Sequence, residues 1–483
     1  MRTTRRCGGF AALLSALACM PLLGSAAEPS PDELTGALER RGFIVTPGAV
    51  EVWNRGEAWC RYDPTIDHAW YNNNAPYLVL KVPRAAGAPE LVQDFKLRPD
   101  EAVVLVGTTP PPERYFAFYS WIANKVYPDG ERLLGLMIAP ADPVNNLSIK
   151  TEGPPGDPFG KRVALVFTPD RGTYRGILEA LGEAGYATDR VNEVPFPAAM
   201  LSLGHGDDGD EFRIQLRNAM WEAGYEKAGA AYIADAPLRM FRATPRVPTD
   251  EGRLEPYPVP ALRIRGTGQT ELNLWNELGV LRQRIIDAHP GMVATDIDVT
   301  MPVGYEGIDH MQRRVPVGGD ARDALCLQAG YLPEFLSWDR RITLGDGDFL
   351  MVFGANHAAT GKTSYMSVNV YTGDAEDGKL SIGTVDDRAL TGTAARFLPA
   401  GDPAADLMYA YKISRSCGRE ANCLQVPPDE LLRKCKRLSV GPDTVLGILF
   451  RNYLEPATKS GAAMQEVLYD RVIKFSPKAP APP

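Results

Sequence analysis

Long apolar runs are missing from this sequence: beyond position 27 no stretch of 18 or more apolar residues occurs. A membrane-spanning helix needs about 20 such residues, so none is predicted there. The local signatures of common exported enzymes are missing too: the Gly-x-Ser-x-Gly elbow, the HExxH zinc motif and the CxxCH haem site. These absences exclude enzymes marked by one short motif. They do not exclude a site assembled from distant loops.

Positive charge is also scarce, with 52 basic against 60 acidic residues and a formal net charge of −8. Three of the arginines lie in residues 1–27, where a short apolar core and small residues follow them. This pattern predicts a secretory signal with cleavage near Ala27, and the pair Arg5-Arg6 leaves twin-arginine export open beside the general route. The remaining 49 basic and 60 acidic residues give a net charge of −11, which disfavours nucleic acid as a partner. We therefore expect a soluble periplasmic or secreted protein.

Cysteines are few and form no metal-ligand pattern. Five remain after residue 27, namely Cys60, Cys326, Cys417, Cys423 and Cys435. In an oxidising compartment Cys417 and Cys423 can close a small loop, so a disulfide is predicted between them. The pairing of the other three stays open, and zinc is not expected because no CxxC motif occurs. No cofactor is evident, although the acidic loop His205–Glu211 could hold calcium; its spacing is not that of an EF-hand, and a solvated turn explains it equally well.

The pattern of apolar residues predicts an α+β fold rich in mixed or antiparallel β-sheet. One βα unit is expected near residues 162–186, and a long amphipathic helix is expected near 271–288, where aliphatic residues recur at helical spacing. A doubly wound sheet would need a regular succession of βα units, which is missing. No internal repeat is visible. The expected segments are a signal peptide (1–27), an N-terminal β-rich lobe (28–150), an α/β segment (160–245), a C-terminal α+β lobe (260–475) and a disordered tail (476–483).

The stretch Phe349–Tyr371 reads as a hairpin of strand, polar tip and strand, and it carries the first candidate site. On its second strand Met366, Val368 and Val370 alternate with polar residues, so one face is expected to enter a core. His357 is one of only five histidines, and its side chain is suited to proton transfer near neutral pH. Lys362 could stabilise an oxyanion, Tyr365 could donate a proton, and Asn356 could position a substrate. The alternative is a surface turn in which Asn356 and a glycine supply unusual backbone angles and His357 is solvated.

Two further places could bind a ligand. Arg265 precedes a glycine-rich turn at the start of the expected helix, where free backbone N–H groups could hold a carboxylate or sulfate. The alternative there is a turn in which Thr270 caps the helix. Asp309, His310 and Arg322 lie in a second polar stretch and could orient a ring or bind a ligand. A loop with ordinary Arg–Asp pairs explains that stretch as well.

These candidates lead to two hypotheses from different classes. The first is an extracytoplasmic enzyme of the hydrolase or lyase type, which acts on a small polar or aromatic metabolite by acid/base chemistry at residues 356–365. The second is a binding or structural protein of the cell envelope without catalysis. It would use the segment 59–77, rich in Trp, Tyr and Asn, to contact a glycan or a protein partner.

Overall fold

A computed structural model describes most of the chain. The described residues are 31–53, 72, 74–127, 129–133, 137–300, 321–330, 341–372, 381–427, 431–432, 437–438 and 440–478. Among them, no helix is both long and apolar enough to cross a membrane. The protein is rich in mixed and antiparallel sheet and has few helices. This agrees with the predicted α+β class.

The N-terminal half of the described chain contains two sheets. The outer N-terminal sheet has the order β1 (Phe43–Pro47), β12 (Leu238–Pro245), β5 (Ala102–Thr108), β9 (Arg162–Thr168) and β10 (Asn192–Pro195). The inner N-terminal sheet has the order β2 (Ala49–Val52), β3 (Tyr77–Pro83), β11 (Glu211–Trp221), β6 (Glu113–Val126) and β7 (Arg132–Leu133), with β4 (Leu91–Val92) beside β3 and β8 (Val144–Asn145) beside β6.

The C-terminal half has two corresponding sheets. The outer C-terminal sheet has the order β13 (Met292–Ile297), β24 (Arg471–Pro477), β16 (Phe349–Ala355), β19 (Met408–Ser414) and β20 (Cys423–Gln425). The inner C-terminal sheet has the order β14 (Val299–Thr300), β15 (Ala324–Ala329), β23 (Leu446–Tyr453), β17 (Tyr365–Thr372) and β18 (Ser381–Asp386). A separate pair joins β21 (Leu431–Leu432) to β22 (Arg437–Leu438).

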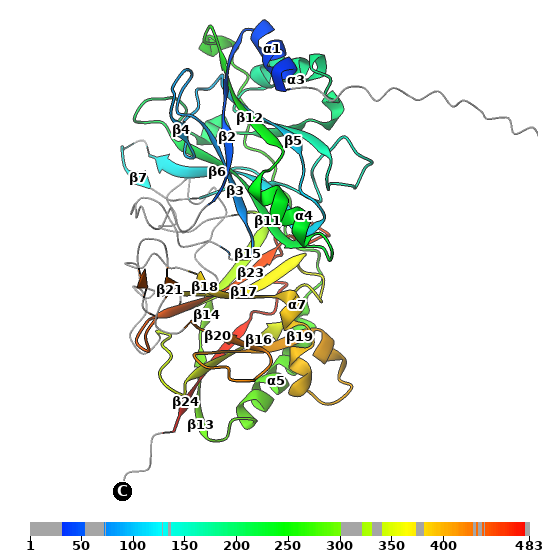
Figure 1. Cartoon of the computed structure of the whole chain (residues 1–483), viewed down its shortest axis with the longest axis vertical. Coiled ribbons are helices and arrows are strands. Elements are labelled where there is room, and N and C mark those ends of the chain that lie inside the picture. The colour runs from blue at the N-terminus through cyan, green and yellow to red at the C-terminus, as the bar shows by residue number, and fades with distance from the viewer. Residues whose placement is uncertain are drawn as a thin grey trace, which may run out of the picture.

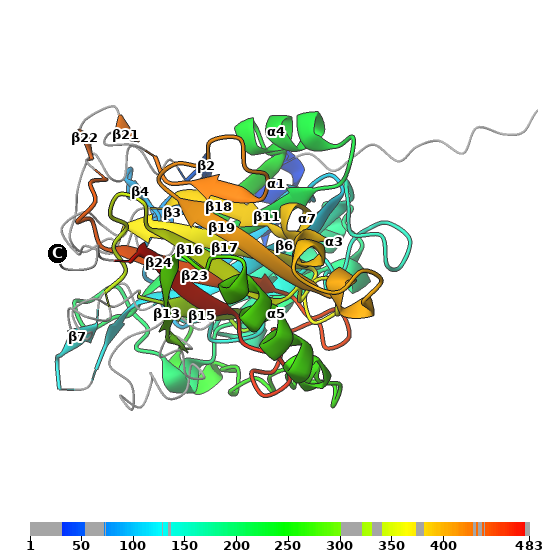
Figure 2. The same cartoon turned by 90° about the horizontal axis from the view of Figure 1, so that it is seen from below.

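The four sheets are stacked as layers along the long axis of the molecule, with helices at both ends (Figure 1). One apolar core fills the space between the two N-terminal sheets, and another fills the space between the two C-terminal sheets. Helices α1 (Pro31–Arg40) and α3 (Arg171–Glu183) cover the outer N-terminal sheet. Helix α5 (Trp275–Asp287) covers the outer C-terminal sheet, as the view from below shows (Figure 2). The two inner sheets therefore face each other in the middle of the molecule.

The remaining helical segments are short. They are α4 (Glu226–Ala234), α7 (Asp387–Leu390) and the 3₁₀ turns η1 (Thr188–Arg190), η2 (Ala198–Met200), η3 (Glu251–Arg253), η4 (Glu271–Leu274), η7 (Thr393–Arg396) and η8 (Pro403–Asp406). The predicted βα unit is confirmed, since Asp170 caps α3 directly after β9 by accepting from the backbone N–H of Thr173 at 2.7 Å. The long helix predicted for 271–288 is not confirmed. Its first turn is the 3₁₀ segment η4, and only 13 residues form α5.

The two halves repeat one architecture, although no repeat is visible in the sequence. In each half a helix precedes the first strand, and each strand of one outer sheet has a counterpart at the same place in the other. The inner sheets correspond in the same way, and both outer sheets carry one parallel pair at the same edge, β9–β10 and β19–β20. The two halves thus repeat one strand order, and their inner sheets face each other.

The counterpart strands β11 and β23 share a local motif. Arg217 and Arg451 are each followed by an asparagine, and three residues after each arginine the backbone is left-handed, at Met220 (φ 61°) and Leu454 (φ 64°). Such angles are uncommon for side chains of this kind. The same structural position in the two halves therefore places one arginine on each side of the central layer.

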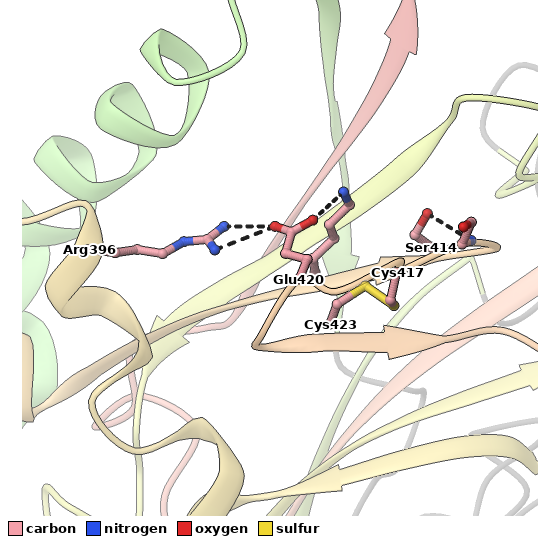
Figure 3. Close-up of a disulfide and its surroundings, with 7 residues drawn as sticks. Arg396, Ser414, Cys417, Glu420 and Cys423 are labelled. Atoms are coloured by element: carbon pink, nitrogen blue, oxygen red, sulfur yellow. Dashed lines mark hydrogen bonds and ion pairs between the residues drawn. A yellow bond between two sulfur atoms is a disulfide. The ribbon is translucent and has the colours of Figure 1, made fainter.

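The predicted disulfide Cys417–Cys423 is confirmed, with the two Cα atoms 5.7 Å apart (Figure 3). It closes the short connection between the parallel strands β19 and β20, where the N-terminal half has helix α3 instead. On the same connection Glu420 pairs with Arg396 and with Lys412, the latter at 2.7 Å. The bridge holds a loop that is too short to pack a crossover helix.

Replacing both cysteines by serine is expected to lower the free energy of unfolding by about 2 kcal/mol, because the small loop gains chain entropy in the unfolded state. Urea denaturation at neutral pH measures the change. A reductant should shift the wild-type curve and leave the Cys417→Ser/Cys423→Ser curve unchanged. Equal stability of both proteins without reductant would contradict the expectation.

Candidate functional site

The polar tip predicted at residues 356–365 connects strands of two different sheets, so no hairpin forms; its titratable side chains are buried, while Ala359 and Gly361 are exposed. It joins β16 to β17 with a left-handed glycine at Gly361 (φ 82°), as the surface-turn alternative expected. However, His357 has no exposed surface at all, and Lys362 is 5% exposed. The side chains of His357 and Lys362 are therefore neither solvated nor part of an open wall of a cleft.

His357 lies between two carboxylates that come from other parts of the chain. Its Nδ1 atom is 2.9 Å and 2.8 Å from the two carboxylate oxygens of Glu271, and its Nε2 atom is 3.5 Å from Oδ2 of Asp470. Glu271 also accepts hydrogen bonds from Thr360 and from the backbone N–H of Leu468. The imidazole thus connects η4, the turn between β16 and β17, and the segment that leads into β24.

The charges around His357 decide its protonation. Burial alone would lower the pKa of His357, but the charges of Glu271 and Asp470 outweigh burial and raise this pKa to about 10. Burial would likewise raise the pKa of Glu271, yet the imidazolium holds that pKa below its ordinary value. His357 is therefore a buried cation at neutral pH. A protonated ring cannot accept a proton, so the geometry gives little support to a general base at this position.

Lys362 is held in the same manner by a second acidic group. Its Nζ atom donates to Glu466 at 2.6 Å, to Glu455 at 3.0 Å and to the Thr267 hydroxyl at 3.1 Å. Burial would lower the pKa of Lys362, but the hydrogen bonds to both carboxylates raise it. All three ammonium protons have acceptors. The ammonium group therefore stabilises the fold at this junction.

The glycine-rich turn after Arg265 does bind a carboxylate, and that carboxylate belongs to this chain. The backbone N–H groups of Thr267 and Gly268 donate to Glu466 at 3.0 Å and 2.6 Å. Hydrogen bonds from these groups and from Lys362 overcome the effect of burial and lower the pKa of Glu466 to about 2. The expected helix cap is also present, since the Thr270 hydroxyl accepts a hydrogen bond from the backbone N–H of Leu272. Glu466 occupies the anion site that the sequence indicated.

The other residues predicted at the tip have separate positions. Asn356 is buried, donates to Thr391 at 3.2 Å, and accepts from the backbone N–H groups of Ala358 and Ala359, which orders the turn. Tyr365 points toward the inner N-terminal sheet, where Asn72 donates to its hydroxyl at 3.3 Å. The structure brings His357, Lys362 and Asn356 onto one turn. It places the Tyr365 side chain in a different layer.

The remaining predicted binding residues also make structural contacts. Arg265 donates to the carbonyl of Ala324 at 2.9 Å. Arg322 is buried, donates to the carbonyl of Arg263 at 3.0 Å and lies 3.4 Å from Asp142. Both therefore fix the chain around β15. Asp309 and His310 lie outside the described residues, as do Cys60, Cys435 and most of the segment 59–77.

One carboxylate of the acidic loop that was considered for calcium, Asp210, forms an ion pair with Lys125. Asp210 is fully buried, accepts from Lys125 at 2.7 Å and from the backbone N–H groups of Val126 and Ser202, both at 2.8 Å. Asp207 and Asp208 are exposed. In the part of the chain that the structure describes, no three metal-ligating side chains gather into a group.

The central layer between the two inner sheets has an unusual composition. On β17, Met366, Val368 and Val370 enter the C-terminal core, so the predicted core face is confirmed. The alternate residues of β17 face the inner N-terminal sheet across this layer. The layer is built mainly from buried polar and aromatic side chains: Tyr77, Tyr115, Tyr119, Trp121, Gln215, Arg217, Asp323, Cys326, Gln328, Tyr365, Ser367, Asn369, Tyr371, Arg451 and Tyr453. Sheets that face each other normally bury apolar side chains, so this polar layer needs an explanation.

Arg217 is the most informative residue of the layer. It is 7% exposed, and its guanidinium carbon lies 5.0, 4.7 and 4.9 Å from the ring centroids of Tyr77, Tyr119 and Tyr453. One nitrogen donates to the Tyr119 hydroxyl at 3.2 Å, while Nε has no hydrogen-bond partner among the described residues. No described carboxylate pairs with this cation. A buried guanidinium of this kind is suited to an anion.

The nearest acid is reached only through tyrosine hydroxyls. Tyr119 and Tyr115 both donate to Asp323, the latter at 3.1 Å, and their own hydroxyls are 2.6 Å apart. Burial raises the pKa of Asp323 to about 6, against the opposing effects of Tyr119 and of the charge on Arg217. This carboxyl group is thus only partly available to balance the guanidinium near pH 6.

The counterpart arginine lies on the other side of the layer. Arg451 donates to the hydroxyls of Tyr453 at 3.2 Å and of Tyr371 at 3.0 Å. The free thiol of Cys326 is nearby, and burial raises its pKa. Gln328 on the adjacent strand has a buried side-chain oxygen without a partner among the described residues. The layer therefore combines donors, acceptors and rings, a set suited to a polar ring-bearing ligand.

The sequence indicated two residues of this layer, Tyr365 for a catalytic role and Tyr77 at the end of the segment 59–77. Arg217 and its other tyrosine neighbours were not singled out. In β11 the polar residues alternate with apolar ones, which is also typical of a strand with one face in water. The signal that could have revealed the layer is the Arg-Asn pair at 217–218 and again at 451–452, each inside an apolar strand.

Comparisons with known proteins do not assign the chain to a family. No family model matches it, and no match is found among curated proteins. Among solved structures, the N-terminal CBM22-1-CBM22-2 tandem domain of Xyn10C from Paenibacillus barcinonensis was aligned at 9% identity, over 90% of this chain and 92% of that chain, with a TM-score of 0.13. A score of this size carries no argument about fold or ligand.

Proposed function

We propose that this chain is an exported binding protein whose central layer takes a small anionic ligand with a ring or several hydroxyl groups. The observation that carries the proposal is Arg217, a buried guanidinium enclosed by three tyrosine rings and without a carboxylate partner in the described chain. Buried charges are costly unless they are paired. A carboxylate, sulfate or phosphate group of a ligand would pair with it, and the rings would contact the rest of the ligand.

Binding is favoured over catalysis because of the groups that surround His357 and Lys362. A catalytic His357 would need contact with a substrate and an unprotonated nitrogen. The ring is instead fully buried and flanked by Glu271 and Asp470, which raise its pKa. Lys362 has its three protons engaged. The ion pairs of His357 and Lys362 therefore account for these residues as stabilising groups, and no catalytic role is needed to explain them.

Export is part of the proposal. The signal-like residues 1–27 and the disulfide Cys417–Cys423 support it, because such bonds persist in oxidising compartments outside the cytosol. A ligand of the cell envelope or the medium, either a small molecule or an acidic sugar, would be accessible to a protein in that location.

Replacing Arg217 by glutamine is expected to weaken binding of the ligand about 100-fold, since a charge-assisted contact in a buried site contributes about 1.5–3 kcal/mol. Isothermal titration of the full chain with benzoate, phenyl phosphate, glucuronate and glucose identifies the ligand class and measures the loss. Arg213→Gln is the matched control, because Arg213 lies on the same strand and pairs with Asp94 at 2.6 Å.

Two outcomes would contradict the proposed function. Wild-type protein that binds none of the anions at millimolar concentration would leave the layer as a purely structural contact between two halves. Tighter binding of glucose than of glucuronate, unchanged in Arg217→Gln, would remove the arginine from recognition. The control should bind as the wild type does.

A further inference from the structure

A hollow lies outside the central layer, at the junction of η4, α5 and the segment that leads into β24. We call it the Trp275 groove; it has a volume of about 270 Å³ and is lined by Leu272, Trp275, Met464, Tyr469 and Arg471, among others. Three of its apolar side chains are unusually exposed: Trp275 at 58%, Leu272 at 48% and Met464 at 43%. Single exposed apolar residues are ordinary, but three around one hollow indicate a binding surface.

The exposure of Trp275 is not explained by its place on the helix. Trp275 lies one turn before Leu278, and both belong to the stripe that continues through Leu281 and Ile285. The last three residues are buried against the outer C-terminal sheet. The apolar stripe of α5 therefore runs past the edge of the core and ends in the groove.

One charged side chain lines the groove. The guanidinium of Arg471 is 6.0 Å from the Trp275 ring centroid, and it donates to the carbonyls of Tyr469 and Asp470 at 3.1 and 3.3 Å. No described carboxylate forms an ion pair with it, although the chain has 60 acidic residues against 52 basic ones. An unneutralised cation beside an exposed indole is complementary to an acid group attached to a planar apolar body.

We propose that the Trp275 groove binds a small aromatic acid, with its ring system on Trp275 and its carboxylate on Arg471. The volume suits a ligand at the lower end of the small-molecule range. The site is separate from the central layer, because it lies on the outer C-terminal sheet with α5. It therefore does not depend on the proposed ligand of Arg217.

The test titrates the full chain with 2-naphthoate and with 2-naphthalenemethanol, its neutral counterpart, by isothermal titration calorimetry. Wild-type protein is expected to bind the acid at least tenfold more tightly than the alcohol. Trp275→Ala should weaken both at least tenfold, and Arg471→Gln should weaken only the acid. Val293→Ala, at an exposed position on β13 outside the groove, should change neither.

Further variants keep the test decisive. If Arg471→Gln does not fold, Leu272→Glu serves instead, because loss of the leucine should weaken both probes while the added carboxylate should weaken the acid at least tenfold more than the alcohol. Arg217→Gln should leave naphthoate binding unchanged, which separates the groove from the central layer. The proposal is overturned if neither probe binds, if Trp275→Ala binds both as the wild type does, or if Trp275→Ala only converts a dimer to a monomer in light scattering.

Discussion

Replacing His357 by alanine is expected to lower the free energy of unfolding by about 3–5 kcal/mol, because it leaves two buried carboxylates without their shared cation. Glu271 and Asp470 are 2% and 0% exposed, so bulk water does not solvate these carboxylates as it would at the surface. A loss of this size is a large share of the stability of a typical domain. Urea denaturation followed by circular dichroism measures it at pH 6.5.

A double-mutant cycle separates the ion pair from ordinary loss of packing. Glu271→Gln alone should be strongly destabilising, because a neutral amide no longer balances the imidazolium. The combination of His357→Ala with Glu271→Gln should cost less than the sum of the two single changes, since each variant removes the partner of the other. Additive effects, or a loss below about 1 kcal/mol for His357→Ala, would show that the pairing contributes little.

The sequence predicted the two strands and the polar turn within residues 349–371, because that information is local. The hairpin itself is wrong, because β16 and β17 belong to different sheets and do not pair with each other. On β17 the alternation of apolar and polar residues defines one face for the C-terminal core, and the structure confirms that face. The same local argument predicted the βα unit at β9 and α3. Strand periodicity and helix capping involve residues a few positions apart, so both patterns can be recognised directly in the sequence.

The repeated architecture could not be predicted in this way. The two halves share strand order, while the neighbours of equivalent residues differ. Arg217 pairs across β11 and β3 with Tyr77, whereas its counterpart Arg451 pairs across β23 and β15 with Cys326. Packing requires volume and polarity to match within each half, and it does not require the same side chains in both halves.

The candidate site shows a second limit. His357 and Lys362 were selected because imidazole and ammonium groups can transfer protons. Their roles depend on partners that lie 86 to 113 residues away in the sequence, as the contacts with Glu271 and Asp470 show. Side chains at such distances along the chain show no periodic relation to the tip. The sequence therefore indicates reactive residue types, and only the fold shows that both are neutralised.

The same pairing of His357 makes the stability of the protein depend on pH. The pKa of His357 is about 10 in the folded protein, against an ordinary value of 6.5. A group whose pKa is raised by folding contributes stability that is fully present below its unfolded pKa and is lost as the pH rises through the folded pKa. We therefore expect the free energy of unfolding to fall by about 1.4 kcal/mol per pH unit above pH 6.5, or about 3 kcal/mol by pH 9.

Urea denaturation at half-unit steps from pH 6 to pH 9 tests this slope, and His357→Gln is the control, because glutamine can form hydrogen bonds but does not titrate. The wild-type curve should decline over this range, while the curve of the variant should be nearly flat from a lower starting value. Glu271 affects stability at low pH, because folding lowers the pKa of its carboxyl group. Its contribution to the free energy of unfolding is present above its unfolded pKa and is lost as the pH falls through its folded pKa. Parallel curves for the two proteins above pH 6.5 would show that the imidazolium is not the group responsible, and the buried cation would have to be sought elsewhere in the fold.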